Sequence, residues 1–255
     1  MTEMRTNPVS ADISPEEWQV RTDLAALHRL YVHFGLTDLI YTHITARVPG
    51  EPDHYLIKAD ELLMEEVTAS NLLKVALDGT LVSGGYPPNL AGHLIHSTVL
   101  RARPDLHVLA HTHSRCGAAV AAMKDGLLPL SQFANMVIPA VSYHPYQDVT
   151  TAEAECAALA RDFPDGKYVM VMQNHGLLAA GRSVAECFYY LYFTEMACKI
   201  QVDVLASGQD PILCSDSIVQ GLYTYKGAPE VPPTGVRVWP AMLRLLDRNM
   251  PDYKD

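Results

Sequence analysis

Two short fragments hold the residues of this chain whose types and spacing best suit chemistry, His111-Thr112-His113 and Asn174-His175-Gly176. Each lies where an apolar, strand-like run ends. Residues i and i+2 of a strand point to the same face, so His111 and His113 can present two imidazoles to one ion. A third imidazole from His175 would leave coordination positions open, as in a catalytic rather than a sealed structural site. The two fragments therefore predict a metal site.

Composition limits the classes of partner. The chain has 255 residues, 49% hydrophobic and 19% charged, so it can bury a substantial core. A net charge of −10 without a Lys/Arg cluster argues against nucleic-acid partners. No apolar run approaches the roughly 18 residues that span a bilayer, and the N-terminus lacks an apolar signal stretch. Five cysteines without a C-x-x-C pair suit a reducing compartment. We expect no membrane partner and a cytoplasmic location.

Helices and strands alternate along most of the chain, which favours an α/β fold with helices covering one sheet. Helices are expected at 14–35, 89–103, 116–123, 151–161 and 183–206. Strands are expected at 41–48, 54–57, 107–110, 136–141, 168–172 and 177–180. After Gly208, five prolines are expected to break any long element. The segment 209–255 is thus predicted to pack on the domain 14–208, or on a neighbouring subunit, rather than to form a second domain.

Several separated motifs in this order resemble the class II aldolase/adducin family. Arg103-Pro104-Asp105 precedes the first histidine fragment, and Gln173-Asn174-His175-Gly176-Leu177-Leu178 contains the second. The remaining motifs of the resemblance are Thr37-Asp38-Leu39-Ile40-Tyr41-Thr42-His43-Ile44, Glu65-Glu66-Val67-Thr68-Ala69, Leu127-Leu128-Pro129-Leu130 and Gly181-Arg182-Ser183-Val184-Ala185-Glu186. The resemblance covers about residues 18–208. It implies a three-layer α/β/α fold with a central, mainly antiparallel β-sheet.

The resemblance also implies a cofactor and an assembly. One divalent ion (Zn, Mn or Fe) is expected on His111, His113 and His175. Members of the family commonly form tetramers with active sites between subunits, so a homotetramer is expected here. Tyr223 and Tyr225 of the proline-rich segment are candidates for substrate binding in a neighbour's site, with ordinary packing as the alternative.

Departures from the family pattern affect the expected reaction. The acid/base glutamate of the family's sugar-phosphate aldolases aligns with Gly92, and the tyrosine proton donor of fuculose-phosphate aldolase aligns with Phe133. Their phosphate-binding turns align with Thr42-His43 and Asp60-Glu61, and their paired serines align with Leu90-Ala91. Carboxylates at Asp60-Glu61 would repel a phosphate dianion. A phosphorylated sugar is therefore disfavoured as the substrate, and this chain resembles an adducin-like subgroup without the aldolase acid/base residues.

The expected function is a divalent-metal-dependent lyase that cleaves a carbon–carbon bond in a small, non-phosphorylated carbonyl or carboxylate substrate. Decarboxylation is preferred because it needs no base equivalent to the missing glutamate. One alternative is a non-haem iron oxygenase with a three-histidine site, because affinity alone does not identify the metal. The other alternative is an adducin-like interaction module without turnover.

Three more residues are candidates for the site. His93 follows the vacated glutamate position, and its imidazole is a candidate catalytic proton donor. His43 occupies a family substrate-binding turn, and Asn89 begins the helix that leads toward the site, so both are candidates for substrate binding. For each histidine a purely structural role remains the alternative.

Overall fold

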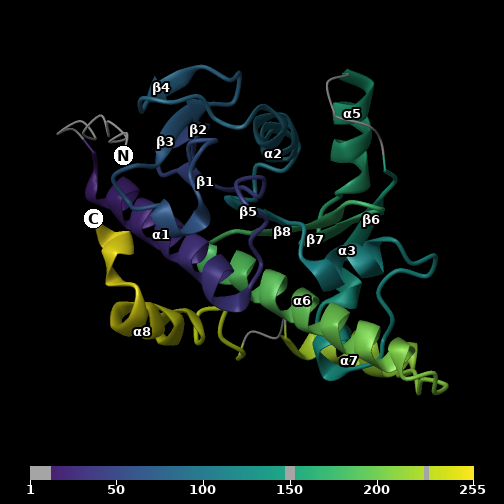
Figure 1. Cartoon of the computed structure of the whole chain (residues 1–255). Coiled ribbons are helices and arrows are strands. Elements are labelled where there is room, and N and C mark those ends of the chain that lie inside the picture. The colour runs from purple at the N-terminus through teal and green to yellow at the C-terminus, as the bar shows by residue number, and fades with distance from the viewer. Residues whose placement is uncertain (1–12, 147–152, 227–229) are drawn as a thin grey trace.

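The computed structural model describes residues 13–146, 153–226 and 230–255, which build a sheet between two layers of helices (Figure 1). The strands of the sheet are β1 (Ile44–Val48), β2 (Glu51–Ile57), β3 (Leu73–Ala76), β4 (Leu81–Ser83), β5 (Val108–Thr112), β6 (Val141–His144), β7 (Val169–Met172) and β8 (Gly176–Gly181). Their order is β4-β3-β2-β1-β5-β8-β7-β6. Every neighbouring pair is antiparallel except β6 and β7. The expected fold class, three layers around a mainly antiparallel sheet, is confirmed.

The helices lie on both faces of this sheet. Those before the tail are α1 (Pro15–Phe34), α2 (Leu90–Ala102), α3 (Arg115–Ala121), α4 (Gln132–Asn135), α5 (Glu153–Asp162) and α6 (Val184–Ala206), with 3-10 turns η1 (Met64–Glu66) and η2 (Ile138–Ala140). In Figure 1, α2 and α5 lie above the sheet, and α1 and α6 lie below it. The central strands β5 and β8 are buried along their whole length. The ends of these two strands therefore provide a rigid base for side chains in a site.

The first helix shows how local sequence signals place an element. The Ser14 side chain accepts a hydrogen bond from the backbone N–H of Glu17, and Pro15 begins the first turn. Gly35 ends the helix at φ +65°, a conformation that favours glycine. Leu24 and Leu27 are fully buried against the core. The expected helix is confirmed at both ends.

Two expectations about elements are wrong. In place of the strand expected at 136–141 the chain forms a turn followed by η2, and only Val141–His144 pairs in the sheet as β6. Pro139 lies inside η2, where its fixed φ suits a turn and its missing N–H cannot serve a ladder. The proline-rich tail does contain longer elements, namely α7 (Asp216–Lys226), α8 (Trp239–Asn249) and the 3-10 turn η3 (Pro251–Lys254). Pro240 is placed in the first turn of α8, where a proline is tolerated.

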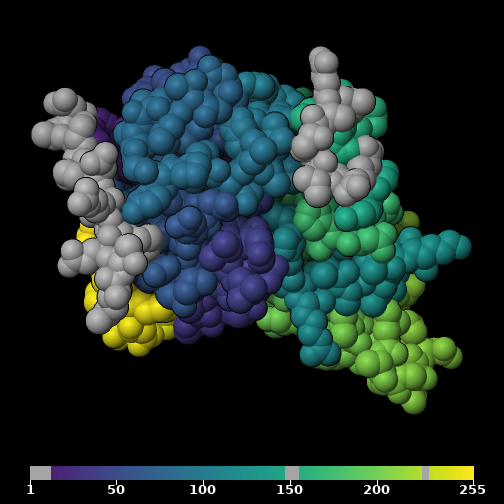
Figure 2. Space-filling model, turned by 45° about the horizontal axis from the view of Figure 1, so that its top comes forward, coloured from purple at the N-terminus to yellow at the C-terminus, as the bar shows by residue number. Residues whose placement is uncertain are grey.

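The tail packs on the rest of the chain. The Trp239 indole N–H donates to Asp23 of α1 over 3.0 Å, and Arg29 of α1 pairs with Asp252 at 2.9 Å. Leu246 and Tyr253 are buried in the common core. The end of α6 and the residues after it project from the body in Figures 1 and 2. Contact of the tail with a neighbouring subunit stays a prediction.

Candidate metal centre

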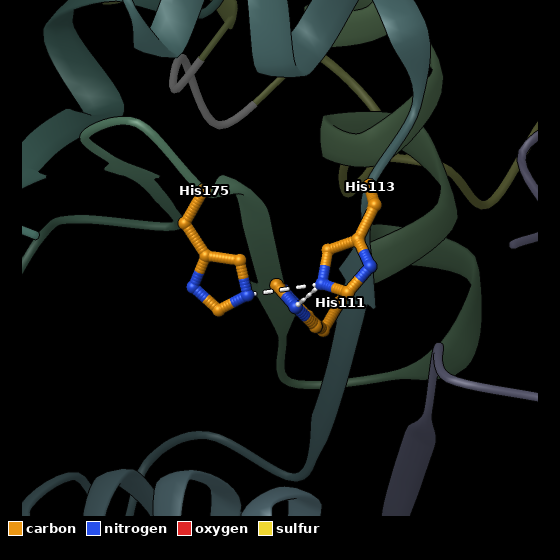
Figure 3. Close-up of side chains that lie close together, drawn as sticks. All are labelled: His111, His113 and His175. Carbon is orange, nitrogen blue, oxygen red and sulfur yellow. Dashed lines mark hydrogen bonds between the residues drawn. The ribbon is translucent and has the colours of Figure 1, made fainter. Parts of the chain in front are cut away.

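Three imidazoles converge at one end of the two central strands (Figure 3). His111 lies in β5, His113 follows its end, and His175 lies in the turn between β7 and β8. The Nε2 atom of His113 is 2.8 Å from Nε2 of His111 and 2.9 Å from Nε2 of His175. All three ligand atoms lie within 4.8 Å of one another. We call these residues the three-histidine cluster.

The other ring nitrogens fix the direction of two of these imidazoles. Nδ1 of His113 lies 2.9 Å from the Asp38 carboxylate, and Nδ1 of His111 lies 3.0 Å from the Leu177 carbonyl oxygen. Both partners only accept hydrogen bonds, so in the neutral form each of these two rings carries its proton on Nδ1. The Nε2 lone pairs of His111 and His113 therefore face each other, an arrangement that a cation would stabilise. This donor set fits a divalent ion with imidazole ligands.

Burial favours the neutral, metal-competent form of His111 and His175. It lowers the pKa of His111 well below the usual histidine value, and the neighbouring histidines act in the same direction. Burial, followed by the effect of His113, lowers the pKa of His175 to about 4. These rings are ready to donate lone pairs at neutral pH.

The backbone around the cluster is fixed by buried hydrogen bonds. The Tyr31 hydroxyl of α1 donates to the His111 carbonyl over 3.1 Å, and the Thr112 hydroxyl donates to the Leu36 carbonyl over 2.9 Å. Asn174 adopts a left-handed conformation at φ +57° immediately before His175. Asparagine tolerates this region better than most residues. The turn therefore brings His175 back toward the end of β5.

His43 lies beside the cluster, and the substrate-binding role expected for it stays a prediction. Its ring stacks on His111 with centroids 5.0 Å apart, and its Nδ1 lies 3.1 Å from Nε2 of His96. Nδ1 of His96 in turn lies 2.8 Å from the Thr45 hydroxyl. Burial lowers the pKa of both His43 and His96 well below the usual value. Sequence reasoning gave His96 no role, because its contact with His43 arises only when α2 packs across β1.

The structure does not bring His93 to the three-histidine cluster. Its Nδ1 lies 2.6 Å from the Tyr55 hydroxyl, and its Nε2 lies close to Gly79. Burial lowers the pKa of His93, and the nearby Arg101 acts in the same direction. The proton-donor role expected for His93 stays a prediction, with Tyr55 as the neighbour that the structure gives it.

The expected substrate-binding residues occupy three different places. The Asn89 amide oxygen caps α2 by accepting from the N–H of Gly92, and its amide nitrogen donates to Asp60 over 2.8 Å. Tyr223 lies within hydrogen-bonding reach of Tyr190 on α6 and raises the pKa of that residue together with burial, the larger cause. Tyr225 is 66% exposed. Substrate contacts for Asn89, Tyr223 and Tyr225 stay predictions.

The two positions at which aldolase residues are missing are filled in different ways. A Cβ added at Gly92 would lie 2.8 Å from Cγ and Cδ2 of His43, so the His43 ring occupies the space in front of this glycine. Phe133 packs against Phe193 of α6, with ring centroids 5.3 Å apart. Neither position carries an acid or a base.

Two further residues of the site escaped the sequence interpretation. Asp38 was visible only as one letter of a longer motif, and nothing in its spacing pointed to His113. The Lys58 side chain is almost fully buried, and its amine donates to the carbonyls of Ile40, Ala59 and Asp60 over 2.9, 3.4 and 3.1 Å. Burial lowers the pKa of Lys58 to about 8. Lys58 thereby anchors the turn that carries Asp38, and the apolar strand before Lys58 gave no hint of this role.

Comparisons with known proteins show the family to which the chain belongs. Residues 22–202 match the family described as Class II Aldolase and Adducin N-terminal domain. A Caulobacter vibrioides protein assigned by name to aldolase class 2 is 40% identical over 251 residues, which cover 98% of this chain and 97% of that protein. Alpha-adducin of Rattus norvegicus is 40% identical over 245 residues, which cover 89% of this chain and 33% of alpha-adducin.

A solved structure extends the similarity to three dimensions. The crystal structure of an aldolase II superfamily protein from Pseudomonas syringae has a TM-score of 0.91 and 42% identity to this chain. The match covers 96% of this chain and 98% of that protein. No helix among the described residues is long and apolar enough to cross a membrane. The chain belongs to the class II aldolase and adducin N-terminal domain family.

Proposed function

We propose that the chain is a divalent-metal-dependent lyase that cleaves a carbon–carbon bond in a small, non-phosphorylated carbonyl or carboxylate substrate. The observation that supports this most is the convergence of three Nε2 atoms, two of them on rings whose Nδ1 atoms are held by fixed acceptors. A divalent ion in such a site polarises a carbonyl or carboxylate oxygen and stabilises enolate-like charge. The Leu177 carbonyl keeps His111 oriented, and Asp38 keeps His113 oriented.

The surroundings of the cluster support a substrate without a phosphate group. The buried Lys58 amine is committed to three backbone carbonyls, and Asp60 adds a carboxylate next to it. A phosphate dianion would lack a free cationic partner at this turn and would meet the charge of Asp60.

The missing acid/base residues support decarboxylation over retro-aldol cleavage. Gly92 and Phe133 cannot exchange protons, and His43 excludes a side chain from the space in front of Gly92. Loss of carbon dioxide needs no base to remove a substrate proton. We therefore propose decarboxylation as the chemistry to test first.

Two alternative functions, an interaction module and an iron oxygenase, can be distinguished from a lyase by experiment. An interaction module without turnover is favoured by the 40% identity to alpha-adducin and by the absence of acid/base residues at positions 92 and 133. An iron oxygenase is the other alternative, because metal affinity alone does not identify the ion that three imidazoles bind.

The test begins with metal content. Protein purified without chelators should contain about one divalent ion per chain, measured by plasma mass spectrometry. His111→Ala and His175→Ala should each lose most of it, whereas His107→Ala, an exposed histidine before β5, should retain it. Equal metal content in all four proteins would refute the ligand assignment.

The second part of the test identifies the reaction. The metal-loaded protein is incubated with a panel of small 2-keto and 2-hydroxy acids, with and without oxygen, and released carbon dioxide and aldehydes are measured. Product formation without oxygen supports a lyase. Product formation only with oxygen and ferrous ion supports the oxygenase, and bound metal without turnover of any panel member supports the interaction module.

A further inference from the structure

A buried chain of hydrogen bonds connects β1 to the cluster through α2. It runs from the Thr45 hydroxyl to Nδ1 of His96 over 2.8 Å and from Nε2 of His96 to Nδ1 of His43 over 3.1 Å. Thr45 and His96 are fully buried, and His43 is 4% exposed. Because water does not reach the inner groups of this series of hydrogen bonds, each proton in the series must have a protein acceptor.

The Thr45 hydroxyl sets the direction of these bonds. Within the part of the chain that the structure describes, its only hydrogen-bond partner is Nδ1 of His96. The hydroxyl proton therefore points to His96, whose Nδ1 accepts it. A neutral imidazole that accepts at Nδ1 carries its own proton at Nε2, so His96 donates to Nδ1 of His43. By the same rule, His43 carries its proton at Nε2.

This Nε2–H group lies against Gly92 of α2, on a ring that stacks on a histidine of the cluster. It lies 3.1 Å from the position that a Cβ at Gly92 would occupy, and among the described residues it has no hydrogen-bond partner. The His43 ring stacks on His111, whose own Nε2 points into the cluster. The His43 ring, which fills the space in front of Gly92, thus places a hydrogen-bond donor beside an imidazole of the cluster.

We propose that Thr45 and His96 fix His43 as a neutral hydrogen-bond donor to an anionic oxygen, a carboxylate or an enolate-like oxygen, of a ligand bound at the three-histidine cluster. His43 neither gains nor loses a proton in this role, so it differs from a base at position 92. The ligand contact rests on the proposed function of the cluster. The direction of the hydrogen bonds does not, because it follows from buried groups alone.

Nitrogen-15 NMR of the histidine rings in metal-free protein tests the direction. His43 and His96 should both be protonated at Nε2, and Thr45→Ser should keep this pattern. Thr45→Val should shift His43 toward the form protonated at Nδ1. Thr42→Val is a matched control, because the Thr42 hydroxyl is buried next to His43 and has no partner among the described residues. Wild-type His43 protonated at Nδ1 would overturn the proposal, whether or not a variant folds.

Binding of oxalate, a small dianion, to zinc-loaded protein tests the ligand contact by calorimetry. Thr45→Val should weaken binding about fivefold or more, the usual effect of losing a buried donor. Thr45→Ser and Thr42→Val should bind as the wild type does. Unchanged oxalate affinity in Thr45→Val, with the ring pattern altered, would overturn the ligand contact. If no zinc binds, the proposed function fails and the ring spectra alone decide the hydrogen-bond direction.

Discussion

The His43 ring and the bare Cα of Gly92 fit together so closely that a single added carbon would collide with the imidazole. Cγ and Cδ2 of His43 lie 2.8 Å from the position of that carbon. The ring cannot retreat freely, because it is bonded to His96 on one side and stacked on His111 on the other. The aldolase glutamate could therefore not be restored at position 92 without displacing His43.

A substitution at Gly92 should consequently destabilise the protein. Gly92→Ala and Gly92→Glu overpack a buried contact and should lower the free energy of unfolding by about 1–3 kcal/mol, measured by urea denaturation. Gly221→Ala is the control, since that glycine is also helical but has open space around it. A helical glycine replaced by alanine should raise stability by up to about 1 kcal/mol. A Gly92→Ala protein as stable as Gly221→Ala would show that the His43 ring moves freely.

Asp38 should control how tightly the cluster binds metal. Its carboxylate accepts from Nδ1 of His113 over 2.9 Å and orients that ring. Asp38→Ala should weaken zinc affinity about 10–100-fold in a chelator competition titration. Asp38→Asn should weaken it less, because an amide oxygen still accepts the hydrogen bond. Asp53→Ala removes an exposed carboxylate as a control for net charge, and an equal loss there would contradict the role of Asp38.

The parts of this site that the sequence reveals are those set by local spacing. Two histidines two residues apart at the end of an apolar run share a strand face, which is why spacing alone predicts that His111 and His113 act as a pair. The partners Asp38 and His96 come from a distant turn and from α2. They could not be predicted, because their contacts depend on how these elements pack across the sheet.

The distinction between local sequence signals and long-range packing also explains which parts of the fold could be predicted. The helix over 14–35 has a cap, a first-turn proline and a terminal glycine, and these local signals predict both of its ends. Met136 to Val141 has the apolar composition of a strand, yet Pro139 and the packing of α4 on α6 turn it into helical turns. His93 and His96 lie on the same helix, and only the angle at which α2 crosses β1 and β2 decides that His96 meets His43 while His93 meets Tyr55.

The left-handed backbone of Asn174 should matter for metal binding because it precedes a cluster histidine. Asn174→Gly removes the strain at φ +57° and should retain both stability and metal content. Asn174→Val places a β-branched residue in this conformation and should cost about 1–3 kcal/mol of unfolding free energy. It should also lower metal content by displacing His175. Unfolding in urea and plasma mass spectrometry measure the two effects, and a Val variant equal to the Gly variant in both would contradict the prediction.

His28 should make the protein sensitive to acid. Its ring is fully buried in α1, its Nδ1 donates to the Leu24 carbonyl over 2.7 Å, and its Nε2 has no partner among the described residues. Burial lowers its pKa from 6.5 to about 3, and the charges of Lys58 and Arg29 act in the same direction. Between these two values the unfolded chain binds a proton that the folded protein does not. The free energy of unfolding therefore falls as the pH drops below 6.5.

At pH 5 the contribution of His28 to this loss should be about 2 kcal/mol, because each pKa unit corresponds to about 1.4 kcal/mol. His28→Phe cannot take up the proton, so its unfolding free energy in metal-free protein should fall about 2 kcal/mol less between pH 7 and pH 5 than that of the wild type. His33→Phe, which removes an exposed imidazole from the same helix, is the control. Only the His28 variant removes a ring that must stay neutral to remain in the core. If urea denaturation gives the two variants the same pH dependence, another buried group is therefore responsible for the acid sensitivity.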